Sequence, residues 1–165
     1  MTNKTSLRPG LGWVYAKPWR VIAFGMGSGV IRPAPGTWGT VWAWIAWLAA
    51  LQLMPWGSVP VVLVLSFVVG VWACQRSGDD LGVADHGGMV WDEAVAFWLV
   101  LWLLPFNTWW MQVLAFLSFR LFDIVKPAPI RYFDAKVGGG FGVMLDDILA
   151  AVYSLAVLYL VAYFV

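Results

Sequence analysis

AVAFWLVLWLLPFNTWWMQVLAFLSF, residues 94–119, is the stretch whose interpretation decides the fold. It carries no charge over about 26 residues and is interrupted once, by Pro-Phe-Asn at 105–107. One alternative is a single kinked and tilted helix that crosses a bilayer once. The other is a pair of helices near 89–104 and 108–125, because proline and asparagine favour a turn between them.

The polar segments on either side favour the pair of helices. A single crossing would place residues 76–93 and 120–147 on opposite membrane faces, whereas a helical hairpin places both on one face. The N-terminal residues 1–20 are basic and contain no acid, which favours a cytoplasmic location for that end. The hairpin therefore gathers every ionisable residue at the cytoplasmic face, and it is the arrangement we predict.

The whole composition indicates a membrane protein. Of 165 residues, 62% are hydrophobic and 12% charged, where roughly half and a quarter are usual in soluble domains. The mean hydropathy is +0.79, and the 13 tryptophans suit membrane interfaces. The length predicts a single domain, 1–165. We expect a membrane environment and no nucleic-acid partner. The sequence does not indicate the oligomeric state.

Three further charge-free runs complete the predicted topology. Residues 38–54 and 59–75 are each about 17 residues long, and 148–165 is about 18, which is marginal but sufficient for a bilayer. The apolar part of 21–40 is too short to cross, so we expect there an interfacial or re-entrant segment that leads into a turn at the Pro35–Thr40 motif. The predicted fold is an all-α polytopic membrane helical bundle of about five spans, arranged as two hairpins plus a C-terminal helix.

Most of the chemistry lies in FRLFDIVKPAPIRYFDAKVGGGFGVMLDD, residues 119–147. Charges are costly near hydrocarbon, so a charged cluster in an apolar protein indicates a functional site. The charged residues of this stretch are Arg120, Asp123, Lys126, Arg131, Asp134, Lys136, Asp146 and Asp147. Cations mixed with carboxylates predict an anionic substrate together with a hard cation such as Mg²⁺.

Two acidic pairs open predicted helices, each after a predicted glycine-rich loop: Asp92 with Glu93, and Asp146 with Asp147. Anions are favoured in the first turn of a helix, which would explain one acid in each pair. Adjacent residues point about 100° apart on a helix, so the second acid can face the bundle. The alternatives are therefore a simple helix-end charge and a metal ligand.

Asp123 falls near the end of its predicted helix, where the helix dipole disfavours an anion. Either Arg120, three residues earlier, compensates its charge, or a bound cation does so. Both alternatives stay open from the sequence.

For the remaining polar residues the sequence gives weaker evidence of a functional role. Arg32, Lys126 and Arg131 are cations near the same face, where they would contact either substrate phosphate or lipid headgroups. Arg131 is the best candidate for gripping two phosphate oxygens with its planar fork. His86 is either a plain loop residue or a proton donor to a leaving alkoxide. Asp79 and Asp80 are expected to be solvated loop acids.

Four motifs occur in a fixed order: Pro35-Gly36-Thr37-Trp38-Gly39-Thr40; Asp85-His86-Gly87 with Val90-Trp91-Asp92-Glu93; Phe119-Arg120-x-x-Asp123-x-x-Lys126-Pro127 running into Pro129-Ile130-Arg131-x-Phe133-Asp134; and Gly139–Gly142 with Met144-x-Asp146-Asp147. In these motifs the chain resembles the phosphatidylglycerophosphatase A family over roughly residues 20–150. The resemblance implies an all-helical, Mg²⁺-dependent enzyme of the bacterial inner membrane. Such an enzyme removes the terminal phosphate of the lipid substrate phosphatidylglycerophosphate, here at the cytoplasmic face.

The residues and the resemblance together give three sets of expected roles. The metal set is Asp92, Glu93, Asp123, Asp146 and Asp147. The phosphate set is Arg32, Thr37, Arg120, Lys126 and Arg131. The catalytic set, which would orient water or move protons, is Asp85, His86 and Asp134.

Two other functions are alternatives to a lipid phosphatase. A CDP-alcohol phosphotransferase would carry DxxDGxxAR followed by GxxxDxxxD, and neither pattern occurs in the sequence. A non-catalytic transporter or lipid-binding scaffold would place ionisable residues near the middle of its spans. Here they flank the apolar runs instead, which favours the enzyme.

Overall fold

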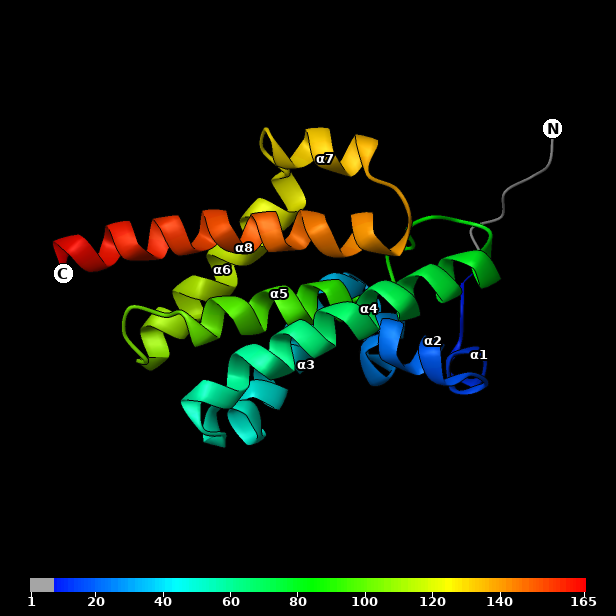
Figure 1. Cartoon of the computed structure of the whole chain (residues 1–165), viewed down its shortest axis with the longest axis horizontal. Helices are drawn as coiled ribbons and strands as arrows, with labels where there is room; N and C mark the ends of the chain where they lie inside the picture. The colour runs from blue at the N-terminus through cyan, green and yellow to red at the C-terminus, as the bar shows by residue number, and fades with distance from the viewer. Residues whose placement is uncertain (1–7) are drawn as a thin grey trace.

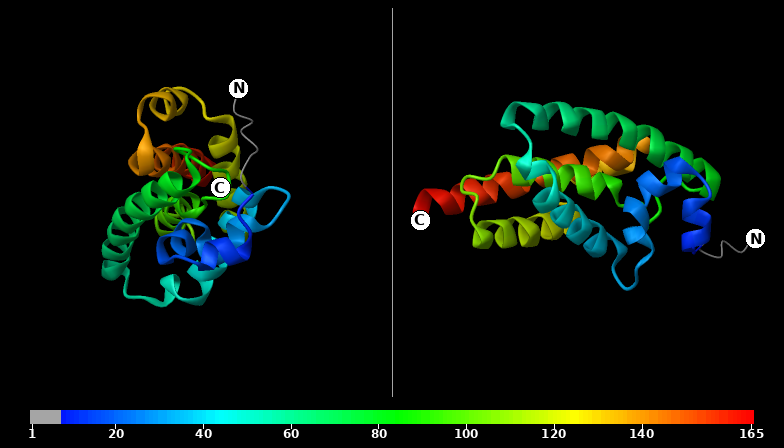
Figure 2. Two further views of the ribbon diagram at one scale, coloured as in Figure 1. Left: turned by 90° about the vertical axis from the view of Figure 1, so that its right-hand side faces the viewer. Right: turned by 90° about the horizontal axis from the view of Figure 1, so that it is seen from below.

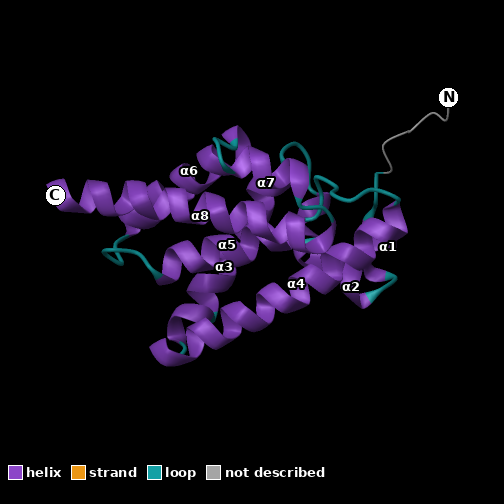
Figure 3. Ribbon diagram, turned by 45° about the horizontal axis from the view of Figure 1, so that its top comes forward, coloured by secondary structure: helices purple, strands orange, loops and turns teal. Residues whose placement is uncertain are grey.

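The computed structural model describes residues 8–165, apart from the side chain of Asp134. The described chain is helical and contains no strand, which confirms the all-α prediction (Figure 3). Its α-helices are α1 (Leu11–Tyr15), α2 (Pro18–Ala23), α3 (Pro35–Ala49), α4 (Val59–Leu81), α5 (Trp91–Trp102), α6 (Trp109–Val125), α7 (Ile130–Lys136) and α8 (Gly139–Phe164). Short 3₁₀ helices are η1 (Gly25–Val30), η2 (Leu51–Leu53) and η3 (Trp56–Ser58).

Helices α5 and α8 form the centre of the bundle. The long helix α8 packs against α4, α5, α6 and α7, while α3 packs mainly against α5 (Figures 1 and 2). Nearly the whole of α5 is buried, including Phe97, and α8 contributes the buried Met144 and Leu158. Residues placed at the start of α5 and within α8 are therefore held by the most tightly packed part of the protein.

The predicted interruption at 105–107 is present. Helix α5 ends at Trp102 and α6 begins at Trp109, so the single kinked helix over 94–119 was the wrong alternative. The predicted pairing of neighbouring helices into two hairpins is not confirmed, because α3 packs on α5 and makes little contact with α4. The connection 50–58, with its two short 3₁₀ helices, is long enough to separate α3 from α4.

Among residues 8–165, two helices are long and apolar enough to cross a membrane. They are α4 together with η3, from Trp56 to Leu81, and α8 from Gly139 to Phe164. Helices α3, α5 and α6 have 15, 12 and 17 residues, fewer than the roughly 20 of a typical span. The topology of five spans therefore stays a prediction.

The C-terminal end of α4 corrects the expected polar loop at 76–93. The helix continues to Leu81, because Ser77, Gly78 and Leu81 are buried on one of its faces. Asp80 is also more than a solvated loop acid. Its carboxylate accepts hydrogen bonds from Trp19 and Arg20, at 2.8 and 2.9 Å, and pairs with Lys17 at 3.0 Å. These contacts attach the N-terminal helix α2 to the end of α4.

The start of α8 corrects the expected position of its acids. Asp146 and Asp147 lie about two turns inside α8 and not in its first turn, since the helix already begins at Gly139. A loop is predicted for these glycines, but α8 begins within them, and Gly140 packs closely against α4. A Cβ on Gly140 would lie 2.1 Å from the backbone oxygen of Val71.

The N-terminal segment is helical where a turn was expected. Residues 21–40 include the end of α2, the 3₁₀ helix η1 and the first turns of α3, which begins at Pro35. Proline is favoured at the first helical position because its missing N–H needs no partner there. The motif from Pro35 to Thr40 therefore presents its side chains from a helix.

The described charged residues are separated from the charge-free ends of the bundle. Figure 1 shows the connections 50–58 and 103–108 and the C-terminus toward one end, on the left. The N-terminal helices and the loop 82–90 lie toward the other end. The right-hand view of Figure 2 shows the same arrangement. The charge-free connections 50–58 and 103–108 and the charge-free C-terminus thus lie toward the same end of the bundle.

Candidate functional site

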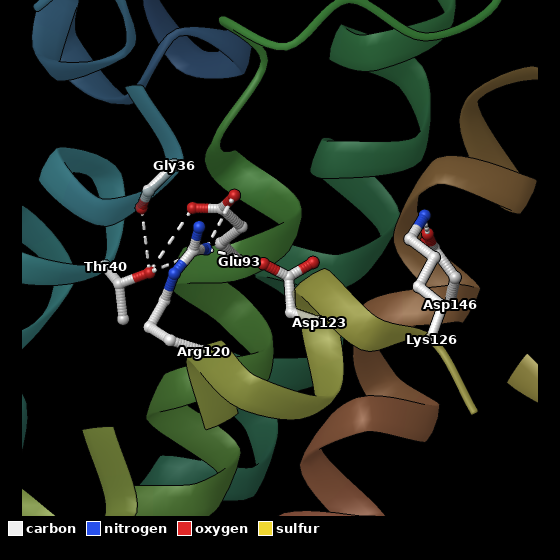
Figure 4. Close-up of polar contacts among 7 residues, drawn as sticks. All are labelled: Gly36, Thr40, Glu93, Arg120, Asp123, Lys126 and Asp146. Atoms are coloured by element: carbon white, nitrogen blue, oxygen red, sulfur yellow. Dashed lines mark hydrogen bonds and ion pairs between the residues drawn. The ribbon is translucent and has the colours of Figure 1, made fainter. Parts of the chain in front are cut away.

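The centre of the polar cluster is the guanidinium of Arg120 on α6. Its Nη1 lies 3.0 Å from Oε1 of Glu93 on α5 and 2.6 Å from Oδ2 of Asp123, one turn further along α6 (Figure 4). All three side chains are 11–13% exposed, so water screens these ion pairs poorly. Of the two explanations for Asp123, compensation by Arg120 is therefore observed.

Helix α3 contributes a hydroxyl and a close backbone contact to this cluster. The Oγ1 of Thr40 lies 2.9 Å from the carbonyl oxygen of Gly36, 3.3 Å from Oε2 of Glu93 and 3.5 Å from Nη1 of Arg120. A Cβ on Gly36 would lie 2.1 Å from Oε1 of Glu93. The absence of a side chain at this position is what lets α3 approach the ion pair.

Gly36→Ala is therefore expected to lower both the unfolding temperature and any activity, because the added methyl group displaces Glu93 from Arg120. A loss of about 1–3 kcal/mol is typical of overpacking a filled site. Gly57→Ala is the matched control, since a Cβ there has nothing within 4 Å. Thermal unfolding in detergent compares the two variants, and equal stability of both would contradict the packing argument.

A second ion pair joins α6 to α8. The Nζ of Lys126, at the C-terminal end of α6, contacts Oδ2 of Asp146 (Figure 4). Lys126 has a left-handed backbone conformation with φ of 43°, which ends α6 and directs the chain toward α7. Asp146 is 7% exposed and Lys126 26%, so the cation lies on the solvent side of this pair.

Two carboxylates lie deeper, Asp92 on α5 and Asp147 on α8. They are 8% and 2% exposed, and each has one buried oxygen without a hydrogen-bond partner: Oδ1 of Asp92 and Oδ2 of Asp147. The two carboxylates are close enough to repel each other, and Asp147 also interacts with Asp123, Asp146 and Glu93. Uncompensated negative charge in an apolar setting is costly, which indicates a place for a cation.

The carboxylates fit a Mg²⁺ site that is completed by water and substrate phosphate, and they do not fit a site made of protein ligands alone. Among residues 8–165, apart from Asp134, no three His, Cys, Asp or Glu side chains are grouped closely enough to hold one ion. A ready-made cage of carboxylates is therefore not present in the described part. However, Mg²⁺ commonly keeps several waters and takes only one or two carboxylates plus substrate phosphate. The free oxygens of Asp92 and Asp147 fit that second form.

Arg120 also has an unused donor. Its Nε is buried and has no hydrogen-bond partner, while Nη1 holds the two carboxylates. A guanidinium presents its Nε and Nη groups as a fork that matches two phosphate oxygens. Asp147 interacts electrostatically with both Arg120 and Asp92, so the unpaired N–H donor and the unpaired carboxylate oxygens belong to one buried cluster, a combination suited to binding an anion together with a cation.

Other predicted site residues lie outside this set of contacts. Arg32 and Arg131 are exposed, and Thr37 is half-buried; no described contact joins any of the three to the ion pairs. The predicted role of Asp134 falls on a side chain outside the described part. All of these roles stay predictions.

Asp85 and His86 lie in the loop before α5. Asp85 is exposed and interacts electrostatically with Asp92, which places it at the edge of the cluster. The Nδ1 of His86 accepts a hydrogen bond from the Gly88 N–H at 3.0 Å, and its ring lies 5.9 Å from that of Phe24. These contacts hold the ring of His86 against Gly88 and Phe24 without assigning it a role.

Sequence reasoning missed Thr40 and Gly36 as parts of the site. The sequence assigns a site role to Thr37 alone within the Pro35–Thr40 motif. The available signal was the spacing of four residues between Gly36 and Thr40, which places both on one face if the motif is helical. If the motif is a turn, as the sequence predicts, the spacing carries no such signal.

Comparison with known proteins gives a consistent result. Residues 21–162 match the family model described as Phosphatidylglycerophosphatase A. The chain is 44% identical over 146 residues to the phosphatidylglycerophosphatase A of Haemophilus influenzae, covering 88% of this chain and 90% of that protein. It is 40% identical over 148 residues to that of Escherichia coli, covering 90% and 86%.

A third relative carries a different name. A provisionally named phosphatidylinositol-3-phosphatase of Bacteroides thetaiotaomicron is 40% identical over 141 residues, covering 81% of this chain and 87% of that protein. No solved structure matches the chain.

Proposed function

We propose, because the chain belongs to the phosphatidylglycerophosphatase A family, that the buried cluster around Arg120 is the site where it hydrolyses phosphatidylglycerophosphate. The enzyme is a phosphoric monoester hydrolase of phospholipid synthesis, and its products are phosphatidylglycerol and inorganic phosphate. One observation carries the assignment of the site: the unpaired Nε of Arg120 and the unpaired oxygens of Asp92 and Asp147 occur in the same buried cluster.

The reaction replaces one phosphorus–oxygen bond by another. Water attacks the terminal phosphorus, the bond to the glycerol oxygen breaks, and the leaving alkoxide takes up a proton. Mg²⁺, when bound at Asp92 and Asp147, would supply positive charge to the phosphoryl oxygens. The chain itself supplies Arg120 and Lys126 to offset the charge of the phosphate.

The proton transfers would fall to Asp85 or Asp134 and to His86. Asp85 or Asp134 would orient the attacking water and accept its proton, and His86 would return a proton to the leaving oxygen. Asp85 is supported by its electrostatic interaction with Asp92, and His86 by its place next to Asp85 in the same loop.

Phosphate release by the purified protein tests this function. Release from phosphatidylglycerophosphate is expected in Mg²⁺ and not in EDTA. Parallel assays with phosphatidylinositol 3-phosphate and with glycerol 3-phosphate would show whether headgroup and lipid tails are both required. No release from phosphatidylglycerophosphate would refute the function, whereas release that resists EDTA would refute only the metal.

The two apolar helices and the relatives indicate a membrane protein. We propose that the bundle crosses the bacterial inner membrane about five times, with the polar cluster at the cytoplasmic face. The support is the separation of charged from charge-free segments and the many exposed apolar side chains on α4 and α8.

Cysteine labelling tests this orientation. Asn107→Cys is expected to react with a membrane-impermeant maleimide from the periplasm, and Ala84→Cys only after the inner membrane is opened. Both positions are exposed, and the native Cys74 is buried and adds little background. Labelling of both positions from the same side would contradict the proposed topology.

A further inference from the structure

Thr40 occupies an unusual position for a threonine inside a helix. It is completely buried, and its hydroxyl is within hydrogen-bond reach of one carbonyl, one carboxylate and one guanidinium. A threonine inside a helix commonly bonds back to the carbonyl four residues earlier, and Gly36 provides that partner. The contacts with Glu93 and Arg120, which belong to other helices, are not explained by this local hydrogen bond.

The hydroxyl can serve both kinds of partner at once. It has one proton to donate and lone pairs to accept. The proton can go to Gly36 or, by rotation of the hydroxyl alone, to Oε2 of Glu93, while an N–H of Arg120 donates to the same oxygen. Thr40 therefore touches both members of the pair that joins α5 to α6.

Glu93 is held from two sides by these contacts. Arg120 contacts Oε1 and Thr40 contacts Oε2, so each carboxylate oxygen has its own partner. A carboxylate held at one oxygen can rotate about that contact, whereas two contacts from different helices fix its plane. Fixing Glu93 also fixes Nη1 of Arg120, and with it the direction of the unpaired Nε edge.

We propose that Thr40 is a positioning residue that orients Glu93 and, through Glu93, the guanidinium of Arg120 toward the substrate phosphate. This inference rests on the proposed function of the cluster. Thr40 itself does not touch the reacting atoms. Its hydroxyl sets the geometry of two residues that come from different helices.

Three variants separate this role from a packing role. Thr40→Val keeps the shape and removes the hydroxyl, and it is expected to lower kcat/KM for phosphatidylglycerophosphate by about 10- to 100-fold, the usual value of a hydrogen bond to a charged group. Thr40→Ser restores the hydroxyl and should recover most of the activity. Ser154→Ala is the matched control, because the buried Ser154 makes the same bond to the carbonyl four residues earlier, 2.8 Å from Ala150. It should leave kcat/KM unchanged.

A double-mutant cycle on stability supplies a test that does not depend on activity. Thr40→Val is expected to lower the unfolding temperature by about 2–4 °C in the native background and by much less in a Glu93→Gln background, because the partner is already altered. Equal shifts in both backgrounds, or an active Thr40→Val enzyme, would overturn the proposal. If the native protein releases no phosphate, the proposed function fails, and the cycle still tests the contact with Glu93.

Discussion

Arg120→Ala is expected to abolish phosphate release and to destabilise the fold. The substitution leaves Glu93 and Asp123 as two buried carboxylates without their shared cation. Breaking a buried ion pair by removing one partner typically costs about 3–5 kcal/mol. The same change removes the Nε donor proposed for the substrate phosphate, so activity should fall beyond what the loss of folded protein explains.

Arg120→Lys separates these two effects. Lysine keeps the positive charge but lacks the fork of the guanidinium. Most of the stability should therefore return, while activity stays about 100-fold or more below the native enzyme. Arg76→Ala is the surface control, because Arg76 is exposed on α4. Thermal unfolding and phosphate release measured together would contradict this account if Arg120→Ala behaved like Arg76→Ala.

Asp147→Asn is expected to have opposite effects on stability and activity. Asp147 is 2% exposed and repelled by Asp92, Asp123, Asp146 and Glu93. Removing its charge relieves this repulsion, and each kcal/mol relieved raises the unfolding temperature by about 2–4 °C in a protein of this size. Phosphate release should nevertheless fall by about 100- to 1,000-fold, since the variant loses a proposed metal ligand. A site whose like charges lower the stability of the fold but serve its function shows the common trade-off between stability and activity.

The metal dependence of stability completes this test. Mg²⁺ that binds the folded protein raises its unfolding temperature, and the rise should be smaller for Asp147→Asn. Asp80→Asn is the control, and its unfolding temperature should change in the opposite direction. Asp80 is paired with Lys17 and Arg20, so removal of its charge should lower the unfolding temperature. An Asp147→Asn protein that is both less stable and fully active would show that its carboxylate is structural.

Most residues of the site could be predicted from the sequence. Which acid pairs with which base could mostly not be predicted. The acids and bases stand out because charges are expensive in so apolar a chain. The contact of Arg120 with Asp123 was foreseeable because three residues along a helix bring side chains together. Glu93 with Arg120, and Lys126 with Asp146, join helices whose relative placement no local spacing specifies.

The errors in helix boundaries have a common physical cause. Charged residues from 76 to 81 and glycines from 138 to 142 both resemble loop sequence. Burial of one face of α4 and the close approach of Gly140 to Val71 extend both helices through these stretches. Local preference was overridden by packing with a distant segment, which the pattern of single residues does not reveal.

The sequence by itself determined that the chain is helical, which segments avoid charge, and which residues can do chemistry, because these depend on composition and on the cost of charge in an apolar setting. Only the tertiary structure decided which carboxylate each cation holds, which oxygens stay free, and that Gly36 and Thr40 belong to the site. Those contacts depend on how α3, α5, α6 and α8 pack, and packing is set by shape over the whole bundle.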